Sequence, residues 1–260
     1  MTQEERLLAQ HALLISSKKL TTEQICEHFN ISKDSARRDL IKLGEFHDVQ
    51  RIRGGAILTP VNKQTLPYTQ RLQTSGIKMA LGKAAANLVN ENDFIIVDSG
   101  TSLTAMVSQI TNSTTIVTNS IDCLALVASN ENINVHLLGG QLNHYHRAIV
   151  GNKAVEQLLD YQVNKVFLGV CALSELGLST SSEEEATIKK AMIKQAKQLI
   201  LVCDSSKFEQ QNFHNICGLD KVDIIITDQC PAPNLLASIK NQGIDLQIIN
   251  ETNKDNNNEC

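Results

Sequence analysis

The sequence lacks the features that mark membrane and exported proteins. It contains no run of about 18 uninterrupted apolar residues, which is the length that a membrane-spanning helix requires. Its N-terminus, MTQEERLLAQ, has no basic stretch followed by an apolar one, so it does not resemble a signal peptide. Hydrophobic residues make up 42% of the chain and charged residues 20%, as in ordinary globular proteins. We therefore expect a cytoplasmic protein with no membrane partner.

The cysteines lack the spacing that metal and redox sites require. There are seven, an odd number, and no two of them form a CxxC pair. Cys171 and Cys203 lie in or beside apolar β runs, and Cys26 and Cys123 lie in helical patterns. We interpret these residues as buried thiols in a reducing compartment rather than as metal ligands or redox centres, and we expect neither a cofactor nor a metal.

An excess of positive charge is also missing. The net charge of −4 argues against a protein that is basic throughout, although a basic face confined to one small domain would not show in that total. With 260 residues, the chain is long enough for two domains. Changes in composition predict a first domain at 1–58, a linker at 59–76, a second domain at 77–250 and a disordered polar tail at 251–260.

The first domain shows the pattern of two short helices, a turn and a third helix. Apolar residues recur at helical spacing from Glu5 to Ile15. Thr21 and Gln24 have the spacing of a capping box and predict a second helix over Thr22–Phe29. After a short turn, Ser32 is a natural N-cap for the third helix. This order predicts a helix-turn-helix.

The third helix, SKDSARRDLIKL, carries charged side chains on its outward face, while Ala36, Leu40 and Leu43 form its inward face. A helix in this position of a helix-turn-helix enters the major groove of double-stranded DNA. The alternative is a solvated charged face, which is what most charge runs are. The preceding helices and turn favour DNA binding. The residues expected at the DNA are Lys33, Ser35, Arg37, Arg38 and Lys42.

A β-hairpin is expected after the third helix. Val49–Leu58 has the sequence VQRIRGGAIL, with Gly54 and Gly55 at the turn. Arg51 and Arg53 project from one side of the first strand, because side chains alternate along a strand. The hairpin is typical of the wing of a winged helix, whose arginines contact the DNA backbone or minor groove. Alternatively, it is a structural hairpin with surface arginines.

The second domain alternates apolar β runs with helical patterns, which predicts a mostly parallel α/β sheet with helices on both faces. A helix is expected first, at Ile77–Val89. The expected strands are Phe94–Val97, Thr115–Val117, Asn134–Leu138, Val163–Gly169, Leu199–Val202, Val222–Ile226 and Leu246–Ile249. The expected helices between them are Leu103–Ile110, Ile121–Ala128, Ala148–Leu159, Glu184–Ala196 and Asn234–Asn241, and Gln141–Arg147 is expected to be a flexible polar loop.

Small and polar residues follow several of these strands. The first strand leads into DSGTS at residues 98–102, which resembles a phosphate cradle at a helix start but, taken alone, is equally typical of an ordinary N-cap. Because the carboxyl ends of parallel strands meet at one crevice, the recurrence of such residues favours a small-anion site there. The candidates are Asp98, Gly100, Thr101, Ser102, Asn119, Ser120, Gly139, Gly140, Glu185, Lys189, Asp204 and Lys207.

Nearly the whole chain resembles the DeoR family of bacterial transcription regulators. The family's first domain usually carries VSxxTIRRDLxxLExxG followed by RxHGGA, and here the chain has ISKDSARRDLIKLGEFHDVQRIRGGA. The second domain matches through DSGTS, TNS, LLGGQL, VGNKA, KVFLG, GLSTSSEEEATIKKAM and CDSSKF, in that order. Two departures occur: Ser35 and Ala36 replace Thr-Ile, and residues 44–48 lack the usual Glu-x-x-Gly.

The resemblance implies a winged helix-turn-helix joined to a sensor domain related to ribose-5-phosphate isomerase. It implies that operator DNA binds the first domain and that a phosphorylated sugar binding the second relieves DNA binding. The function expected is that of a regulator, a repressor of a carbohydrate-utilisation operon, which acts as a homo-oligomer, a dimer or tetramer. The rival hypothesis is a sugar-phosphate isomerase-like enzyme with a helical appendage, in which Glu185 with Lys189, or Asp204 with Lys207, moves a proton.

Overall fold

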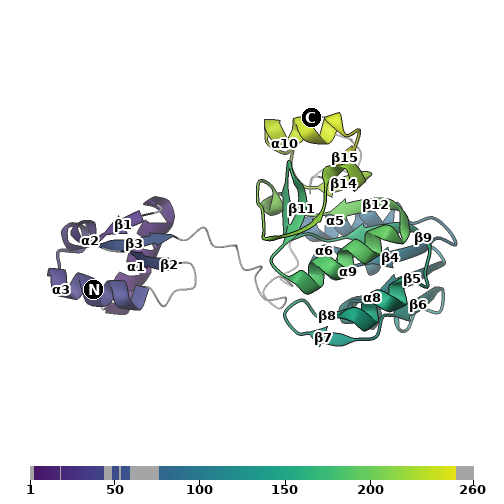
Figure 1. Cartoon of the computed structure of the whole chain (residues 1–260), viewed down its shortest axis with the longest axis horizontal. Coiled ribbons are helices and arrows are strands. Elements are labelled where there is room, and N and C mark those ends of the chain that lie inside the picture. Colours follow the sequence, from purple (N-terminus) through teal and green to yellow (C-terminus); the bar gives the residue numbers. More distant parts are fainter. Residues whose placement is uncertain (1–2, 18, 44–48, 53, 59–75, 250–260) are drawn as a thin grey trace. The chain divides into compact units, whose positions relative to one another are not determined.

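The computed structural model describes residues 3–17, 19–43, 49–52, 54–58 and 76–249 (Figure 1). The chain divides into two compact units, Met1–Thr65 and Leu66–Cys260. The expected linker and tail fall almost wholly outside the described residues, so the expected domain boundaries stay a prediction. Among the described residues, no helix is both long enough and apolar enough to cross a membrane.

The N-terminal unit is a helix-turn-helix followed by a β-hairpin. In chain order it contains α1 (Gln3–Ser17), β1 (Lys19–Thr21), α2 (Thr22–Phe29), α3 (Lys33–Leu43), β2 (Val49–Ile52) and β3 (Gly55–Leu58). The three strands form an antiparallel sheet in the order β1-β3-β2. Its core is formed by Leu7, Leu14, Leu20, Ile25, Ala36, Leu40, Leu43, Val49 and Ala56.

Local capping explains why α2 and α3 begin where they do. The capping box of Thr21 and Gln24 is present, with each side chain bonded to the other residue's backbone N–H. The turn after α2 uses Asn30 in the left-handed region at φ 50°. The Ser32 hydroxyl then accepts a hydrogen bond from the Ser35 N–H at 3.2 Å and caps α3. The predicted helix-turn-helix is therefore confirmed, with β1 as an additional strand.

The C-terminal unit is built on a seven-stranded parallel sheet in the order β15-β14-β12-β9-β4-β5-β6. Its first elements are α5 (Gly76–Ala86), β4 (Phe94–Val97), α6 (Thr101–Val107), β5 (Thr114–Thr118), α7 (Ile121–Val127), β6 (Ile133–Leu137), β7 (Gln141–Asn143), β8 (Ala148–Val150) and α8 (Asn152–Leu158). The rest are β9 (Val163–Leu168), β10 (Ala172–Ser174), β11 (Gly177–Thr180), α9 (Glu183–Lys194), β12 (Ala196–Val202), β13 (His214–Cys217), β14 (Ile224–Thr227), α10 (Pro233–Asn241) and β15 (Asp245–Ile248), with short 3₁₀ turns η1 (Ser205–Lys207) and η2 (Leu219–Lys221).

Helices cover both faces of this sheet, as the alternation of strands and helices predicted (Figure 1). Apolar residues of α5, α6 and α7 pack on one face, against strand residues such as Ile95 and Phe167. Residues of α8, α9 and α10 pack on the other, against neighbours such as Ile96 and Val166. Because side chains alternate along each strand, successive residues of one apolar run serve the two separate cores.

Two expectations about the middle of this unit are wrong. Ala148–Leu159 was expected to be one helix, but Ala148–Val150 is the strand β8 and α8 begins only after Gly151, which has φ 95°. Gln141–Arg147 was expected to be a flexible loop, but Gln141–Asn143 is the strand β7, paired antiparallel with β8. A further three-stranded sheet, β10-β11-β13, was not foreseen. In all of these strands, pairing with a neighbour defines the structure more than local sequence does.

The buried cysteines behave as ordinary thiols. Cys123 and Cys203 are free and buried. Burial raises the pKa of Cys123 to about 12 and also raises the pKa of Cys203, so both remain protonated at neutral pH. Cys26 and Cys171 are both half-buried.

Candidate DNA interface and candidate effector site

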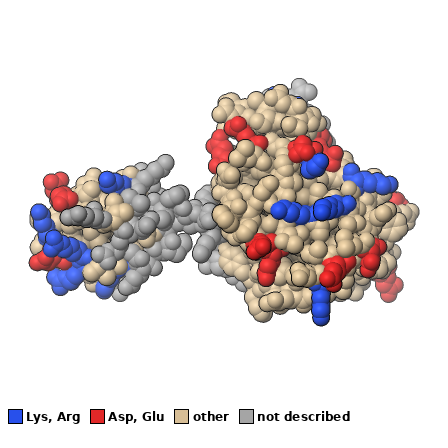
Figure 2. Space-filling view, in the orientation of Figure 1, with Lys and Arg blue, Asp and Glu red and all other residues tan. Residues whose placement is uncertain are grey.

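The third helix presents its cations to solvent. Lys33, Arg37, Arg38 and Lys42 are exposed on α3, whereas Ser35 is half-buried in the first turn of the helix. Figure 2 shows Lys and Arg side chains gathered at the end of the N-terminal unit where α3 lies. Arg37 forms only an exposed ion pair with Asp34 at 3.6 Å, and such pairs are weak. The guanidinium can therefore exchange this partner for a phosphate or a base at little cost.

The hairpin expected after α3 is present as β2 and β3. Its turn contains Gly54 at φ 85°, a left-handed conformation that suits glycine. Arg51 belongs to β2, but its side chain is not described, and Arg53 lies outside the described residues. A groove of about 520 Å³ is lined by residues of α2, α3 and the hairpin: Thr22, Glu23, Lys33, Arg37, Leu40, Ile41, Ile52, Gly54 and Gly55.

Asp39, which the sequence interpretation passed over, attaches the third helix to the first. Its carboxylate is fully buried and accepts hydrogen bonds from Arg6 Nε at 2.6 Å, Gln3 Nε2 at 3.0 Å and Gln10 Nε2 at 3.0 Å. Burial opposes the carboxylate charge, but hydrogen bonds from these donors outweigh it and lower the pKa of Asp39. Asp39 lies three residues after Ala36 and four before Leu43. This helical spacing places Asp39 on the inward face of α3 and could have indicated its burial from the sequence.

Lys42 is less available than expected. Its Nζ donates to Gln3 Oε1 at 2.8 Å, so the first and third helices also meet at this residue. The exposed cation still faces solvent, but binding DNA through it requires breaking or sharing this hydrogen bond.

In the C-terminal unit, a buried charged cluster lies at the carboxyl ends of the strands. Asp98 directly follows β4, and its Oδ2 accepts from Lys189 Nζ of α9 and from the Gly169 N–H after β9 at 3.2 Å. Lys189 Nζ also donates to the Gly169 carbonyl at 2.9 Å. Asp98 is 1% exposed and Lys189 is 2% exposed, so this ion pair is shielded from water.

Glu185 extends the cluster on its other side. Its Oε1 lies 4.0 Å from Lys189 Nζ and 3.3 Å from His146 Nδ1, and its Oε2 accepts a short hydrogen bond from Thr180. Cys171 Sγ lies 3.7 Å from the same Oε2. We call Asp98, Gly169, Lys189, Glu185, Thr180, Cys171 and His146 the strand-end cluster.

Burial and neighbouring charges shift the pKa values of Lys189 and Asp98 in the strand-end cluster. Burial opposes the charge on Lys189, yet Asp98 and Glu185 raise the pKa of Lys189 above its usual value. Burial also raises the pKa of Asp98, against the opposing effect of Lys189. Both directions follow from two carboxylates sharing one lysine in a medium of low dielectric constant.

Asn119 and Ser120 follow β5, the neighbour of β4, and tie the strand end to the β7–β8 hairpin. Asn119 Nδ2 donates to the Ile149 carbonyl at 3.2 Å, and Ser120 caps α7 by accepting from the Cys123 N–H at 3.2 Å. Asn119 is 1% exposed. Within the described part of the chain, Asp98 Oδ1 and Asn119 Oδ1 are buried side-chain oxygens without a hydrogen-bond partner.

The remaining candidates lie around this cluster rather than in it. Gly100 precedes α6 and provides no side-chain cap, while Thr101 and Ser102 are half-buried in the first turn of that helix. Gly139 donates its N–H to Gln157 Oε1 at 2.7 Å and, like Gly140, is exposed. Asp204 caps η1, whose last residue is the half-buried Lys207. Among the described residues, no hydrogen bond or ion pair joins Asp204 or Lys207 to Asp98 or Lys189.

The structure brings the candidates Asp98, Glu185 and Lys189 together and adds four neighbours that were not among the candidate site residues. Gly169, Cys171, Thr180 and His146 reach the cluster from separate elements, and His146 comes from the hairpin that was taken for a loop. His146 lies in the segment Gln141–Arg147, for which a flexible polar loop was expected. It is in fact 7% exposed.

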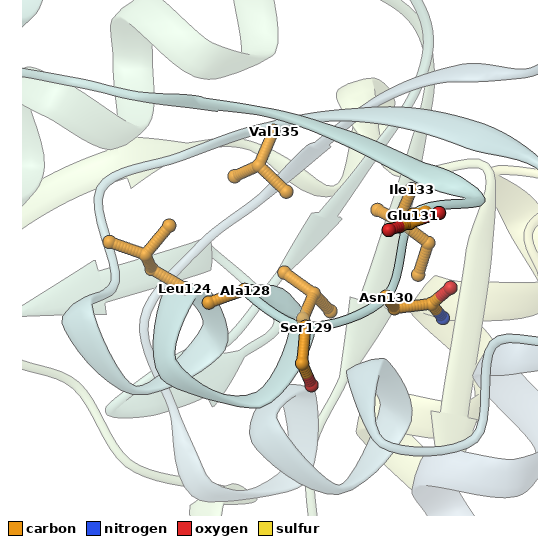
Figure 3. Close-up of a pocket in the computed structure, with 8 residues that line it drawn as sticks. Leu124, Ala128, Ser129, Asn130, Glu131, Ile133 and Val135 are labelled. Atoms are coloured by element: carbon orange, nitrogen blue, oxygen red, sulfur yellow. The ribbon is translucent and has the colours of Figure 1, made fainter.

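A separate hollow lies away from these residues. Figure 3 shows it between α7 and β6, where Leu124 and Ala128 face Ile133 and Val135 across a space of about 450 Å³. Ile133 is the first residue of β6, so the hollow lies near the amino end of that strand rather than at the carboxyl ends.

The N-terminal unit is a helix-turn-helix with a cationic third helix, and the C-terminal unit is a parallel α/β domain with a polar strand-end cluster. Together they define a DNA-binding regulator with a sensor domain. Residues 9–60 match the DeoR-like helix-turn-helix domain, and residues 73–229 match the DeoR C-terminal sensor domain. The chain belongs to the DeoR family of transcriptional regulators.

Sequence relatives place the chain among transcriptional regulators. It is 37% identical to the HTH-type transcriptional repressor GlcR of Bacillus subtilis, over 96% of this chain and 98% of GlcR. It is 28% identical to a putative aga operon transcriptional repressor of Escherichia coli O157:H7, over 86% of this chain and 85% of that protein. Ribose 5-phosphate isomerase A from Neisseria gonorrhoeae is similar in structure, with a TM-score of 0.38 and 14% identity over 52% of this chain and 53% of that one. The two relatives named above are transcriptional regulators, not enzymes.

Proposed function

We propose that the protein is a repressor of a carbohydrate-utilisation operon, which binds operator DNA and releases it when a phosphorylated sugar occupies the sensor domain. GlcR and the aga operon protein, which the chain resembles over most of its length, are both named as repressors. On this proposal the protein acts in the cytoplasm.

The DNA is held by the third helix and the hairpin. Arg37 and Arg38 contact bases or phosphates in the major groove, with Lys33, Ser35 and Lys42 on the flanks. Arg51 and Arg53 contact the backbone or the minor groove. Two such helices must fit successive major grooves, so the protein binds a repeated or palindromic site as a dimer or tetramer.

The single observation that supports a sugar in the sensor domain is the pair of unpartnered oxygens at adjacent strand ends. Asp98 and Asn119 follow Val97 and Thr118, which are partners in the parallel pairing of β4 and β5. Burying an acceptor without a partner costs about 1–3 kcal/mol. A ligand that donates hydrogen bonds to Asp98 Oδ1 and Asn119 Oδ1 would therefore recover this energy. Sugar hydroxyl groups are such donors.

The phosphate of the ligand belongs elsewhere in the crevice. The strand-end cluster already holds two carboxylates against one lysine, so a further anion beside Asp98 would be repelled. Lys207 and the hydroxyl groups of Thr101 and Ser102 suit a phosphate better, with Gly100, Gly139 and Gly140 allowing its close approach. Asp204, Glu185 and Ser120 then face the remaining sugar hydroxyls.

A ligand screen by thermal unfolding tests this proposal. A ligand that binds only the folded protein, present at a hundredfold excess over Kd, stabilises it by about 2.7 kcal/mol and raises Tm by about 5–10 °C. We expect this shift from at least one phosphorylated sugar and not from the same sugar without phosphate or from inorganic phosphate. Lys207→Ala should abolish the shift, whereas Lys197→Ala, at an exposed site on β12, should preserve it. A panel of triose, pentose and hexose phosphates without any shift would contradict the proposal.

A further inference from the structure

An isoleucine is exposed in the middle of the cationic face of α3. Ile41 is 50% exposed, although the adjacent Leu40 is 4% exposed and part of the core. Residues three and four apart share a helix face, so Ile41 lies on the same side as Arg38 and Arg37. An apolar side chain placed among exposed cations is a feature that the folding of this unit does not require.

The charges around Ile41 indicate what covers it. Lys33, Arg37, Arg38 and Lys42 are all exposed on the same short helix. A second copy of α3 packed here would bring like charges together, whereas a polyanion is attracted by them. Ile41 also lines the groove shared with Ile52 and Gly54 of the hairpin, beside Arg37 and Lys33.

DNA offers one apolar group at the edge of its bases. In the major groove, only thymine carries a methyl group, at C5, and apolar side chains that touch it distinguish T·A from the other base pairs. We propose that Ile41 contacts a thymine methyl group in the major groove and is a specificity-determining residue of this protein. The inference rests on the proposed binding of operator DNA by α3.

The test uses the full chain and a DNA site that is selected by its binding to this protein. Duplexes are enriched from a random-sequence library, and each thymine of the enriched site is then replaced singly by deoxyuridine, which removes only the methyl group. Burial of one such group is worth about 0.8 kcal/mol, so wild-type affinity should fall about 4-fold at one thymine in each half-site. Ile41→Ala should bind the thymine and deoxyuridine forms of that site equally.

The matched control is Leu8→Ala, which removes an apolar side chain that is 65% exposed on α1. It should keep the wild-type response to deoxyuridine. Since Ile41 is exposed and alanine favours helices, Ile41→Ala should fold normally, which circular dichroism would verify. If wild type tolerates every deoxyuridine, or Ile41→Ala still loses affinity at the same thymine, the assignment of Ile41 is wrong. Failure to enrich any sequence would overturn DNA binding and, with it, this inference.

Discussion

Two of the buried aspartates, Asp39 and Asp98, are compensated to different degrees. Asp39 receives hydrogen bonds from one arginine and two glutamines, which use both of its oxygens. Asp98 has Lys189 and one backbone N–H at Oδ2, and its Oδ1 is left unpartnered. A buried carboxylate whose two oxygens both accept hydrogen bonds from the protein stabilises the fold. A buried carboxylate with one oxygen unpartnered can still accept a hydrogen bond from a ligand. This difference separates a structural role for Asp39 from the binding role that we propose for Asp98.

Replacement of Asp39 tests the first role. Since the folded-state pKa of Asp39 is lowered, its contribution is present above the unfolded pKa of about 3.9 and is lost as pH falls through the folded value. Asp39→Asn should therefore lower the free energy of unfolding of the N-terminal unit by about 3 kcal/mol at pH 7, and this difference should shrink progressively as pH falls from about 4 through the folded-state pKa. Hydrogen exchange of α1 and α3 amides measures the difference.

Asp34→Asn is the matched control for Asp39→Asn. The Asp34 side chain is 83% exposed and forms only a surface pair, so this change should be nearly neutral. Equal stability of Asp39→Asn and wild type at pH 7 would show that the hydrogen bonds to Asp39 do not stabilise α3.

Replacement of Lys189 tests the strand-end cluster. Lys189→Met leaves Asp98 and Glu185 buried without their cation and should reduce the free energy of unfolding by about 3–5 kcal/mol. Adding Asp98→Asn should recover part of this loss, because it removes the unpaired charge. Lys190→Met changes the exposed neighbour on α9 and should have little effect in urea unfolding. A double variant that is less stable than Lys189→Met would argue against charge pairing as the main interaction here.

At the scale of elements, the structure could be predicted wherever the determinants are local. The capping box at Thr21 and Gln24 and the N-cap at Ser32 mark helix starts within a few residues, and the apolar run Phe94–Val97 marks a buried strand. The hairpins of the C-terminal unit, β7–β8 and β10–β11, could not be predicted in this way. A strand such as Ala148–Val150 has only three residues, and its pairing with Gln141–Asn143 is what distinguishes it from the start of a helix.

The same limit applies to the candidate site. Strand order placed Asp98 and Asn119 at one edge, and the β4–β5 pairing shows them there as neighbours. His146 reaches Glu185 only because the unforeseen β7–β8 hairpin brings it there. The pairing of Lys189 with Asp98 joins residues 91 positions apart, and no local pattern specifies it.

The contact between α5 and α6 gives a prediction in which helix propensity and packing disagree. Alanine in place of an interior helical glycine usually stabilises a helix by about 1 kcal/mol. A Cβ at Gly82, however, would lie 2.6 Å from Met106 N and 2.7 Å from the Ala105 carbonyl carbon on α6. Gly82→Ala should therefore lower the free energy of unfolding by about 1–3 kcal/mol. Thermal unfolding measures this, with the exposed Lys83→Ala on the same helix as a near-neutral control. A higher Tm for Gly82→Ala would refute close packing at this point.

The whole molecule separates its charges between two units. The overall charge is −4, yet α3 alone presents four exposed cations, Lys33, Arg37, Arg38 and Lys42. The first unit thus presents cations on its recognition helix, where DNA can reach them, whereas the charges of the strand-end cluster, Asp98, Glu185 and Lys189, are buried. Regulation then requires only that ligand occupancy change how the first unit engages DNA.

Removal of one α3 cation tests that arrangement. Arg38→Ala should weaken binding to a selected duplex by about 1–3 kcal/mol if Arg38 contacts a base, and it should leave the thermal response to sugar phosphate unchanged. Fluorescence anisotropy and thermal unfolding of the same preparation measure the two properties. Unchanged affinity would remove Arg38 from the interface.

On the proposed function, a phosphorylated sugar in the sensor unit controls DNA binding by the other unit. The most direct test of this control is the Kd for a labelled, selected duplex at constant salt, measured with and without each member of a sugar-phosphate panel. Coupling between sites is typically about 1–3 kcal/mol, so at least one sugar phosphate should raise the Kd about 5- to 150-fold. The same compound should leave the Kd of Lys207→Ala unchanged. A duplex affinity that no sugar phosphate in the panel alters would contradict the account.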